Sequence, residues 1–209
     1  MFNFYRRTPQ INNTRPIKLV FVGDGSTGKS TLYEKCVTNK VDYQFNSEYV
    51  ASDNVHFHVL SFNTNYGIIK CILEDTPGQK KFDDVRYGHL AGADAVICMC
   101  DITKKETCDN AKNWIEYVKN TNNNNSKQPY VLVMENKIDL VENTSMHNMT
   151  HVRKAQLQSL YGNQNNIDHI RVSVRDSTNL KKAFEMILNA YYGVSDITID
   201  PKLTSVKLK

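Results

Sequence analysis

Short apolar runs recur along the chain and alternate with polar segments. Each run has the length and the apolar content typical of a buried strand. The runs predict six strands, at 17–22, 55–62, 68–73, 95–100, 130–134 and 170–174. The second and third strands are joined by a short polar segment that ends in Gly67, which predicts a β-hairpin.

Apolar residues between the strands recur at intervals of three and four, the spacing of an amphipathic helix. Helices are predicted at 29–38, beyond residue 103, at 151–161, and over a final stripe from Leu180 to Tyr191. Strands that alternate with helices predict an α/β fold, with a six-stranded, mostly parallel sheet and helices on both faces. Ligands of such folds bind at the carboxyl ends of the strands.

The pattern fits one domain at 16–194, which we expect to be monomeric. The polar start, 1–15, is expected to be disordered, and residues 195–209 are expected to form a flexible tail. A hydrophobic content of 40% and a charged content of 23% are ordinary for a soluble globular protein. The net charge of +4 is too small to argue for direct binding of nucleic acid.

Cysteine usage and targeting signals favour a cytoplasmic or nuclear protein. The cysteines are odd in number and lie mostly inside apolar runs, which indicates reduced, buried thiols. They are Cys36, Cys71, Cys98, Cys100 and Cys108. The Cys-Met-Cys spacing at 98–100 does not fit a zinc pair. We find no signal peptide, no membrane-spanning run and no cysteine near the end for prenylation, so we expect no membrane anchor.

The strongest chemical motif is Gly-Asp-Gly-Ser-Thr-Gly-Lys-Ser at 23–30. It satisfies G-x-x-x-x-G-K-[ST] between a predicted strand and a predicted helix. The glycines let the backbone approach phosphate oxygens, and the loop N–H groups and the helix dipole favour negative charge. Lys29 is expected to reach the β- and γ-phosphates and Ser30 to ligate Mg²⁺. The expected nucleotide-binding residues here are Asp24, Gly25, Ser26, Thr27, Gly28, Lys29, Ser30 and Thr31.

The same stretch also contains G-x-G-x-x-G, formed by Gly23, Gly25 and Gly28. This spacing occurs in dinucleotide-binding proteins, but alone it is weak evidence. The Lys29-Ser30 extension and the motifs downstream favour a P-loop, and the sequence therefore predicts a P-loop NTPase.

Asp-Thr-Pro-Gly-Gln at 75–79 follows the second strand of the predicted hairpin. Asp75 can hold Mg²⁺ through a water molecule, as a Walker B acid does. The Gly78 N–H can bind a γ-phosphate, giving a loop that tightens with GTP and relaxes after hydrolysis. Gln79 can orient the attacking water. Without the P-loop, a plain turn after a strand would be a reasonable alternative.

Asn-Lys-Ile-Asp at 136–139 stands at the end of the fifth predicted strand. The Asp139 carboxylate can accept two hydrogens from the N1 and N2 edge of guanine, a pairing that adenine does not offer. Asn136 and Lys137 would brace the surrounding loops. Three specified residues alone are weak evidence for guanine binding, but their position after the other two motifs makes the evidence strong. The base pocket is completed by Ser173, Val174 and Arg175.

These four elements, in this order, resemble the Ras superfamily of small GTPases over about 17–192. The resemblance implies a switch that binds GTP or GDP with Mg²⁺ and slowly hydrolyses GTP, with Gln79 and Lys29 as catalytic residues. It implies that Phe45 stacks on guanine, and that replacing Gly25 blocks hydrolysis. It implies that exchange factors, activating proteins and effectors bind 45–54 and 77–88. The implied Mg²⁺ ligands are Ser30, Ser52 and Asp75.

Within the superfamily the chain most resembles the Ran branch. Tyr-Val-Ala-Ser at 49–52 is similar to that branch's Tyr-Val-Ala-Thr. The hairpin Phe-Asn-Thr-Asn-Tyr-Gly-Ile-Ile-Lys at 62–70 resembles Phe-His-Thr-Asn-x-Gly-Pro-Ile-Lys. The missing prenylation cysteine agrees with that branch. The resemblance implies a role in nucleocytoplasmic transport or its subversion.

The chain also departs from the family pattern. Pro77 stands where the family has alanine, and it stiffens the loop by fixing φ. Asp53 replaces leucine, Ser-Val-Arg replaces Ser-Ala-Lys in the base loop, and a short tail with lysines stands in place of an acidic one. Two functions therefore remain open: an active Ran-like switch, favoured by Gln79, Gly25 and Lys29, or a diverged GTP/GDP-binding module with little hydrolysis that sequesters or mimics partners of Ran-like GTPases.

Overall fold

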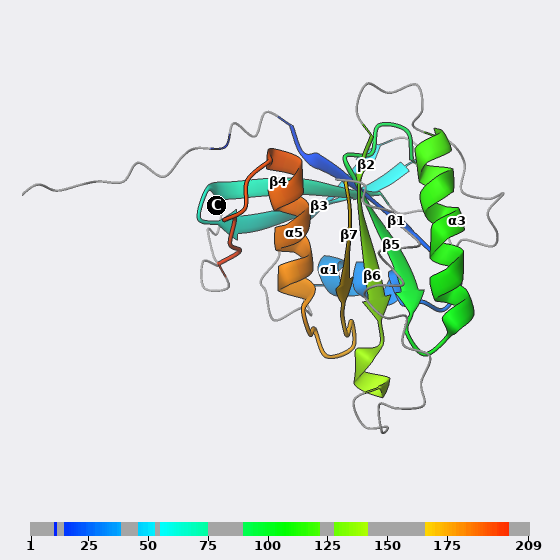
Figure 1. Cartoon of the computed structure of the whole chain (residues 1–209). Coiled ribbons are helices and arrows are strands. Elements are labelled where there is room, and N and C mark those ends of the chain that lie inside the picture. Colours follow the sequence, from blue (N-terminus) through cyan, green and yellow to red (C-terminus); the bar gives the residue numbers. More distant parts are fainter. Residues whose placement is uncertain are drawn as a thin grey trace, which may run out of the picture.

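The computed structural model describes residues 11, 15–38, 46–52, 55–74, 90–121, 128–141 and 166–200, with 46–52, 55–57 and 74 described for the backbone only. In this part of the chain, seven strands form one sheet in the order β2-β3-β4-β1-β5-β6-β7 (Figure 1). The strands are β1 (Ile17–Val22), β2 (Asn46–Ser52), β3 (Val55–Thr64), β4 (Gly67–Glu74), β5 (Ala95–Asp101), β6 (Tyr130–Asn136) and β7 (Ile167–Arg171).

The predicted α/β class and the mostly parallel sheet are confirmed. β1 pairs in parallel with both β4 and β5, and β6 pairs in parallel with both β5 and β7. The predicted hairpin is also present, because β3 and β4 pair antiparallel up to Thr64 and Gly67. All six predicted strands occur, and β2 adds a seventh at one edge through its antiparallel pairing with β3.

The last strand begins at Ile167, whereas the sequence predicts a strand at 170–174. The apolar residues Val172 and Val174 caused this difference. They are buried in the core, but they lie in the loop after β7. β7 is the last strand of the sheet and exposes Asp168. Because the strand contains polar residues, it does not form a continuous apolar run, and the sequence pattern does not predict its start.

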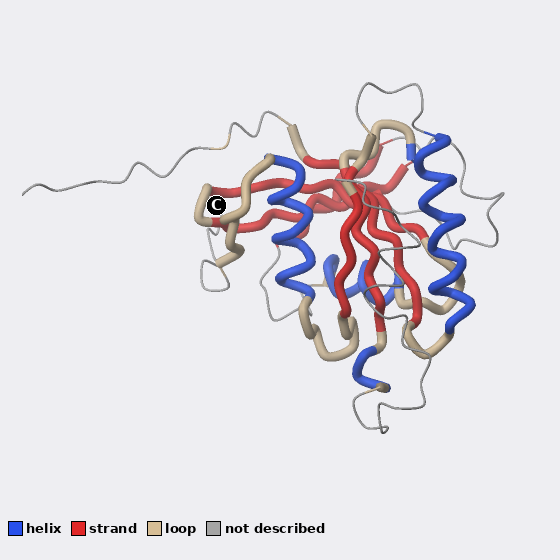
Figure 2. Tube along the Cα trace, viewed as in Figure 1, coloured by secondary structure: helices blue, strands red, loops and turns tan. Residues whose placement is uncertain are grey.

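Helices cover both faces of the sheet (Figure 2). The helix α3 (Lys105–Thr121) packs on one face, where Cys108, Ala111 and Trp114 join a cluster with Val96 and Val133. The helices α1 (Lys29–Val37) and α5 (Leu180–Tyr192) pack on the other, which holds the larger cluster. The predicted helix at 151–161 lies outside the described residues. A short 3₁₀ turn, η2 (Ile138–Leu140), follows β6.

Residues 195–200 pack against the β3–β4 hairpin. Ile197 and Ile199 are 2% and 4% exposed and belong to the core around α5. The Asp200 N–H donates to the Asn63 carbonyl at 2.8 Å, which places this segment along the hairpin edge. The predicted tail therefore begins with six residues that are part of the folded domain, because their two isoleucines are buried there.

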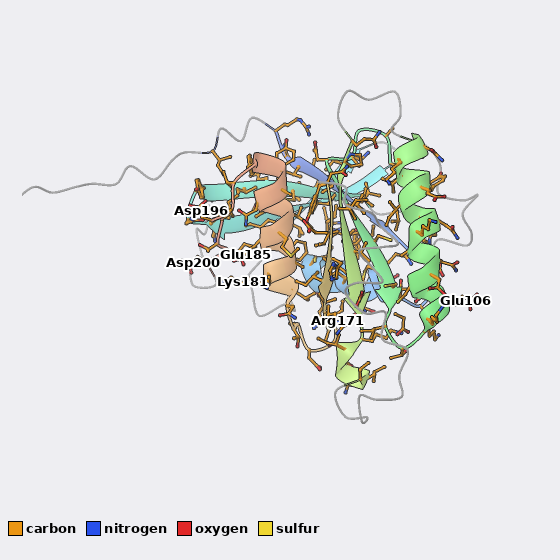
Figure 3. The ribbon with its side chains drawn as sticks, viewed as in Figure 1. Glu106, Arg171, Lys181, Glu185, Asp196 and Asp200 are labelled. Atoms are coloured by element: carbon orange, nitrogen blue, oxygen red, sulfur yellow. The ribbon has the colours of Figure 1, made fainter. Side chains whose placement is uncertain are left out.

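Glu185 of α5 fixes the same segment from the helix side. Its Oε1 accepts a hydrogen bond from the Ile199 N–H at 2.8 Å and lies 3.7 Å from Lys181 Nζ (Figure 3). Residues 201–209 lie outside the described residues, so a flexible tail stays a prediction there. The predicted disordered start, 1–15, likewise lies outside them except for Ile11, which packs on the core, and Arg15.

Arg15 pairs with Asp94 through two hydrogen bonds, both of 2.6 Å.

The five cysteines are buried and form no disulfide bonds, as the sequence predicts. Burial raises the pKa of Cys36 to about 12 and that of Cys98 to about 12, so these thiols stay protonated and unreactive. Among the described residues, no helix has the length and apolar character needed to cross a membrane.

Candidate nucleotide-binding site

Three loops that the sequence singles out lie together at one edge of the sheet. They follow the carboxyl ends of β1, β6 and β7, and β5 ends beside them with Asp101. Because these strands are parallel, their carboxyl ends share an edge. β1 lies next to β5 in the sheet; the connection after β1 leads to α1 on one face, and the connection after β5 leads to α3 on the other, so the chain changes direction between these two strands beside the loop at 23–28.

Two glycines shape the first loop. Gly23 has φ +132°, and a Cβ there would lie 2.2 Å from the Met99 carbonyl oxygen of β5. Gly28 has φ +102°, and a Cβ there would lie 2.2 Å from Asn136 Nδ2. Only glycine allows the loop to lie this close to the carboxyl ends of β5 and β6. Gly25 has no atom within 4 Å of its Cβ position, so the loop is open on that side.

The start of α1 suits an anion. Gly28 is its N-cap, no side chain caps the helix, and its first turn holds no acidic residue. The first N–H groups of a helix have no partners within it, and the helix dipole adds positive potential there. Ser30 and Thr31 are exposed at this end. A phosphate group therefore fits the backbone of this loop.

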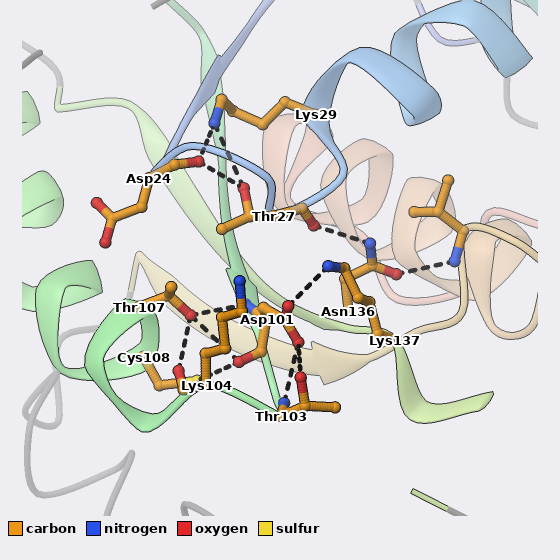
Figure 4. A network of polar contacts seen from close by, with 11 residues as sticks. Asp24, Thr27, Lys29, Asp101, Thr103, Lys104, Thr107, Cys108, Asn136 and Lys137 are labelled. Atoms are coloured by element: carbon orange, nitrogen blue, oxygen red, sulfur yellow. Dashed lines mark hydrogen bonds and ion pairs between the residues drawn. The ribbon is translucent and has the colours of Figure 1, made fainter. Parts of the chain in front are cut away.

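Lys29 folds back over the same loop (Figure 4). Its Nζ donates to the Gly23 carbonyl at 2.7 Å and to the Asp24 carbonyl, and it lies 3.3 Å from Thr27 Oγ1. Burial lowers the pKa of Lys29 to about 8, although the charge of Asp24 acts in the opposite direction. An anion bound beside this ammonium group would raise its pKa back towards the ordinary value.

Nucleotide binding is therefore expected to take up protons. With a pKa of about 8, roughly half of the Lys29 side chains are neutral at pH 8, and an added phosphate favours the charged form. In the loop without nucleotide, the neutral amine is more favourable than in an ordinary lysine, whose pKa is 10.5. Because the bound phosphates favour the charged amine, the affinity for nucleotide should fall as pH rises above 8. Titration calorimetry at pH 8 in buffers of different ionisation enthalpy should give an uptake of about half a proton per nucleotide.

The Lys29→Arg variant is the control for this measurement, because arginine stays charged in proteins. The molar enthalpy of nucleotide binding to this variant should be the same in every buffer, whatever its affinity. If the wild-type heat is the same in every buffer, the proposed link between Lys29 and the phosphates is wrong.

Asn136 joins the first loop to the third. Its Nδ2 donates to the Thr27 carbonyl at 2.9 Å, and its Oδ1 accepts from the Val174 N–H at 2.9 Å. The side chain is only 3% exposed, and both of its polar atoms are satisfied. Asn136 is thus the central link between the predicted phosphate-binding and base-binding loops (Figure 4).

Asp139 is held by the loop after β7. Ser173 Oγ donates to Asp139 Oδ1 at 2.7 Å, and Asp139 Oδ2 lies 3.9 Å from Arg175 Nη1. Arg175 is mostly exposed, so its ion pair with Asp139 contributes little stability. Lys35 of α1 supports the same loop, since its Nζ donates to the Arg175 carbonyl at 2.6 Å and to Ser177 Oγ at 3.0 Å.

Lys137 pairs with a buried aspartate at the end of β5. Its Nζ lies 2.7 Å from Asp101 Oδ2, and Thr103 donates its N–H and its hydroxyl to Asp101 Oδ1 at 3.0 and 2.7 Å. Burial alone would raise the pKa of Asp101, but the bonds from Lys137 and Thr103 outweigh it and hold the pKa below its ordinary value. Asp101 therefore remains ionised and keeps Lys137 oriented.

Left-handed backbone conformations gather in these loops. Within the described residues, the non-glycine residues with positive φ are Ser26, Lys137, Ser177 and Asn179. One lies in each of the first two loops, and two lie between Arg175 and α5. Such conformations are costly and persist where the surroundings enforce them, often at binding sites.

Several predicted site residues lie outside the described residues. They are Phe45, Asp75, Gly78 and Gln79. Ser52 is described for the backbone only, as the last residue of β2. The predicted partner surfaces, 45–54 and 77–88, are described only as the backbone of 46–52. Among the described residues, no group of three or more His, Cys, Asp or Glu side chains is placed to hold a metal ion.

The fold and the three loops define a class. A glycine-shaped loop between a strand and a helix at the switch point of a parallel sheet is the site of a P-loop nucleotide-binding protein. The sequence model of the Ras family matches residues 18–192. The chain belongs to the Ras family, and it has the fold of a GTP-binding small GTPase switch.

The structure places four further residues at the site that no sequence motif indicates. Asp101, Lys35, Asn110 and Trp114 all contact the loops described above. Only Asp101 had a visible signal, because it directly follows an apolar strand whose carboxyl end meets the same edge of the sheet. The other three lie on helices, one or more turns from any motif.

Proposed function

We propose that this protein is a Ran-like molecular switch that binds GTP or GDP with Mg²⁺ and hydrolyses GTP slowly. The observation that supports it best is the pair of hydrogen bonds through which Asn136 joins the Thr27 carbonyl to the Val174 N–H. With this link, one ligand that carries both phosphates and a base can span the loops.

Each loop has a role in the proposal. The N–H groups of 24–31 bind the phosphates, and Lys29 contributes the positive charge. Asp139 accepts hydrogens from the guanine edge, while Ser173, Val174 and Arg175 close the pocket. Ser30, Ser52 and Asp75 would hold Mg²⁺, which neutralises developing charge on the phosphates when bound. Gln79 would orient the water that attacks the γ-phosphate.

The Ran-like assignment rests on the amino-acid sequences of two segments, 49–52 and 62–70. The hairpin turn in the second segment is formed by Asn65 and Tyr66, which are held by the 195–200 segment: Tyr66 donates its hydroxyl to Asp196 at 2.5 Å. We propose a cytoplasmic or nuclear location, regulators and effectors that bind 45–54 and 77–88, and a role in nucleocytoplasmic transport or its subversion.

A binding module with little hydrolysis is the second candidate, and Pro77 favours it. Proline restricts the loop that has to move Gln79 into place. Such a module would bind guanine nucleotide through the same residues and would sequester or mimic partners of Ran-like GTPases.

Single-turnover hydrolysis of bound GTP separates the two candidates. An isolated Ras-like domain turns over at about 10⁻⁴ to 10⁻³ s⁻¹, and we expect a rate in this range. Gln79→Leu should lower the rate by at least about tenfold and leave GTP and GDP affinity unchanged, since the side chain acts on water. An unchanged rate in Gln79→Leu would contradict the switch and support the module. ATP bound as tightly as GTP would contradict both.

A further inference from the structure

The Asp24 side chain is held from outside its own loop. Its Oδ1 accepts a hydrogen bond from Trp114 Nε1 at 2.9 Å, and its Oδ2 accepts one from Asn110 Nδ2 at 2.8 Å. Both donors lie on α3, four residues apart and therefore on one face of the helix. Each carboxylate oxygen thus has its own neutral donor on α3.

This arrangement reduces the electrostatic repulsion that Asp24 would exert on a phosphate bound to the loop. Asp24 is the second residue of a loop whose backbone suits anions, and a carboxylate there would repel a phosphate. Figure 4 shows the Asp24 carboxylate directed away from Lys29, whereas its carbonyl faces that amine. The negative charge is therefore turned towards α3 and away from the side where Lys29 lies.

The donors are well placed to keep it there. Trp114 is 3% exposed and packs edge-on against Tyr117, so its indole has little freedom to move. Asn110 is half-buried beside it. Hydrogen bonds to a charged carboxylate are stronger than those between neutral groups. The carboxylate is thus bonded to a rigid helix and not to the loop itself.

We propose that Asn110 and Trp114 are positioning residues of the nucleotide site. They hold the Asp24 carboxylate away from the phosphates, and so they slow nucleotide release. This inference rests on the proposed nucleotide binding and adds to it two residues of α3 that do not touch the nucleotide themselves.

A reciprocal exchange of the two side chains tests the proposal. Asn110→Asp removes the donor and places a second carboxylate against Asp24, so GDP dissociation should become at least about tenfold faster. Asp24→Asn in the same protein restores the bond in reverse. The new amide at position 24 can donate to the new carboxylate at position 110, and the amide's carbonyl can still accept from Trp114. The double variant should therefore release GDP at close to the wild-type rate.

Two further variants complete the experiment. Asn113→Asp adds the same charge to the exposed side of α3 and should leave GDP release at the wild-type rate. Trp114→Phe keeps an aromatic ring but removes the second donor, and it should also accelerate release. Thermal unfolding of every variant checks that the fold is retained.

The outcomes are distinct. A wild-type protein that binds no guanine nucleotide would overturn the proposed function. A wild-type protein that binds GDP, with an Asn110→Asp variant that releases it at the same rate, would overturn this inference alone. Fast release that Asp24→Asn does not restore would also overturn it, because the effect would then come from damage to α3.

Discussion

Replacing Gly28 with alanine is expected to weaken the binding of guanine nucleotide by at least about 100-fold. The new Cβ would lie 2.2 Å from Asn136 Nδ2, at a φ of +102°. Asn136 is buried and bonded at both ends, so it can move away only by breaking its bonds to Thr27 and Val174. A backbone strain of about 1–3 kcal/mol adds to the loss of two buried hydrogen bonds of about 1–3 kcal/mol each.

Gly67→Ala is a matched control, because Gly67 has a φ of +97° but no atom within 4 Å of its Cβ position. It carries the same kind of backbone strain and lies in the hairpin turn, far along the chain from the loops. Titration calorimetry with GDP should show at least a roughly 100-fold weaker affinity for Gly28→Ala, about 3 kcal/mol, and wild-type affinity for Gly67→Ala. Comparable GDP affinity in both variants would contradict the role of the Asn136 link.

The sequence predicts the fold well because local patterns decide most of it. Strands buried on both faces, such as β5 and β6, are continuous apolar runs, and these were located to within a few residues. The residues of three loops were also found, since their motifs have fixed spacing next to a strand. The structure then brings Thr27, Asn136 and Val174 together, although 109 residues separate the first two.

The remaining features depend on contacts that no local pattern encodes. Trp114 fits an amphipathic stripe on α3 like any core residue, and its bond to Asp24 crosses 90 residues of sequence. The position of Lys35 in the sequence is typical of an exposed helix residue, yet its side chain donates a hydrogen bond to the loop after β7. Residues 195–200 read as a polar tail because only the isoleucines 197 and 199 are apolar, and a two-residue signal is too short to predict burial.

Replacing Asp139 with asparagine is expected to reverse the base preference from guanine to xanthine. In the proposed site, the Asp139 carboxylate accepts two hydrogens from guanine. An asparagine amide would donate one hydrogen where xanthine presents an oxygen. Affinity for GTP should fall about 100-fold, as expected when bonds worth about 1–3 kcal/mol each are lost and a buried group is left unsatisfied. Affinity for xanthosine triphosphate should rise above that for GTP.

The surrounding contacts allow this exchange without damage to the fold. Ser173 Oγ donates to Asp139 Oδ1, and an asparagine carbonyl can still accept that bond. The amide nitrogen then takes the place of Oδ2, whose only described partner is Arg175 at 3.9 Å. Since Arg175 is 77% exposed, losing that pair should change stability little.

Asp176→Asn is the matched control. The Asp176 carboxylate is exposed and lies 3.8 Å from Arg175 Nε, so the variant removes one negative charge beside the same arginine. Its backbone N–H, which donates to Ser173 Oγ at 3.0 Å, is not altered. Competition binding of GTP and xanthosine triphosphate should therefore show wild-type preference in Asp176→Asn and reversed preference in Asp139→Asn. Retained GTP preference in Asp139→Asn would mean that the base is recognised elsewhere.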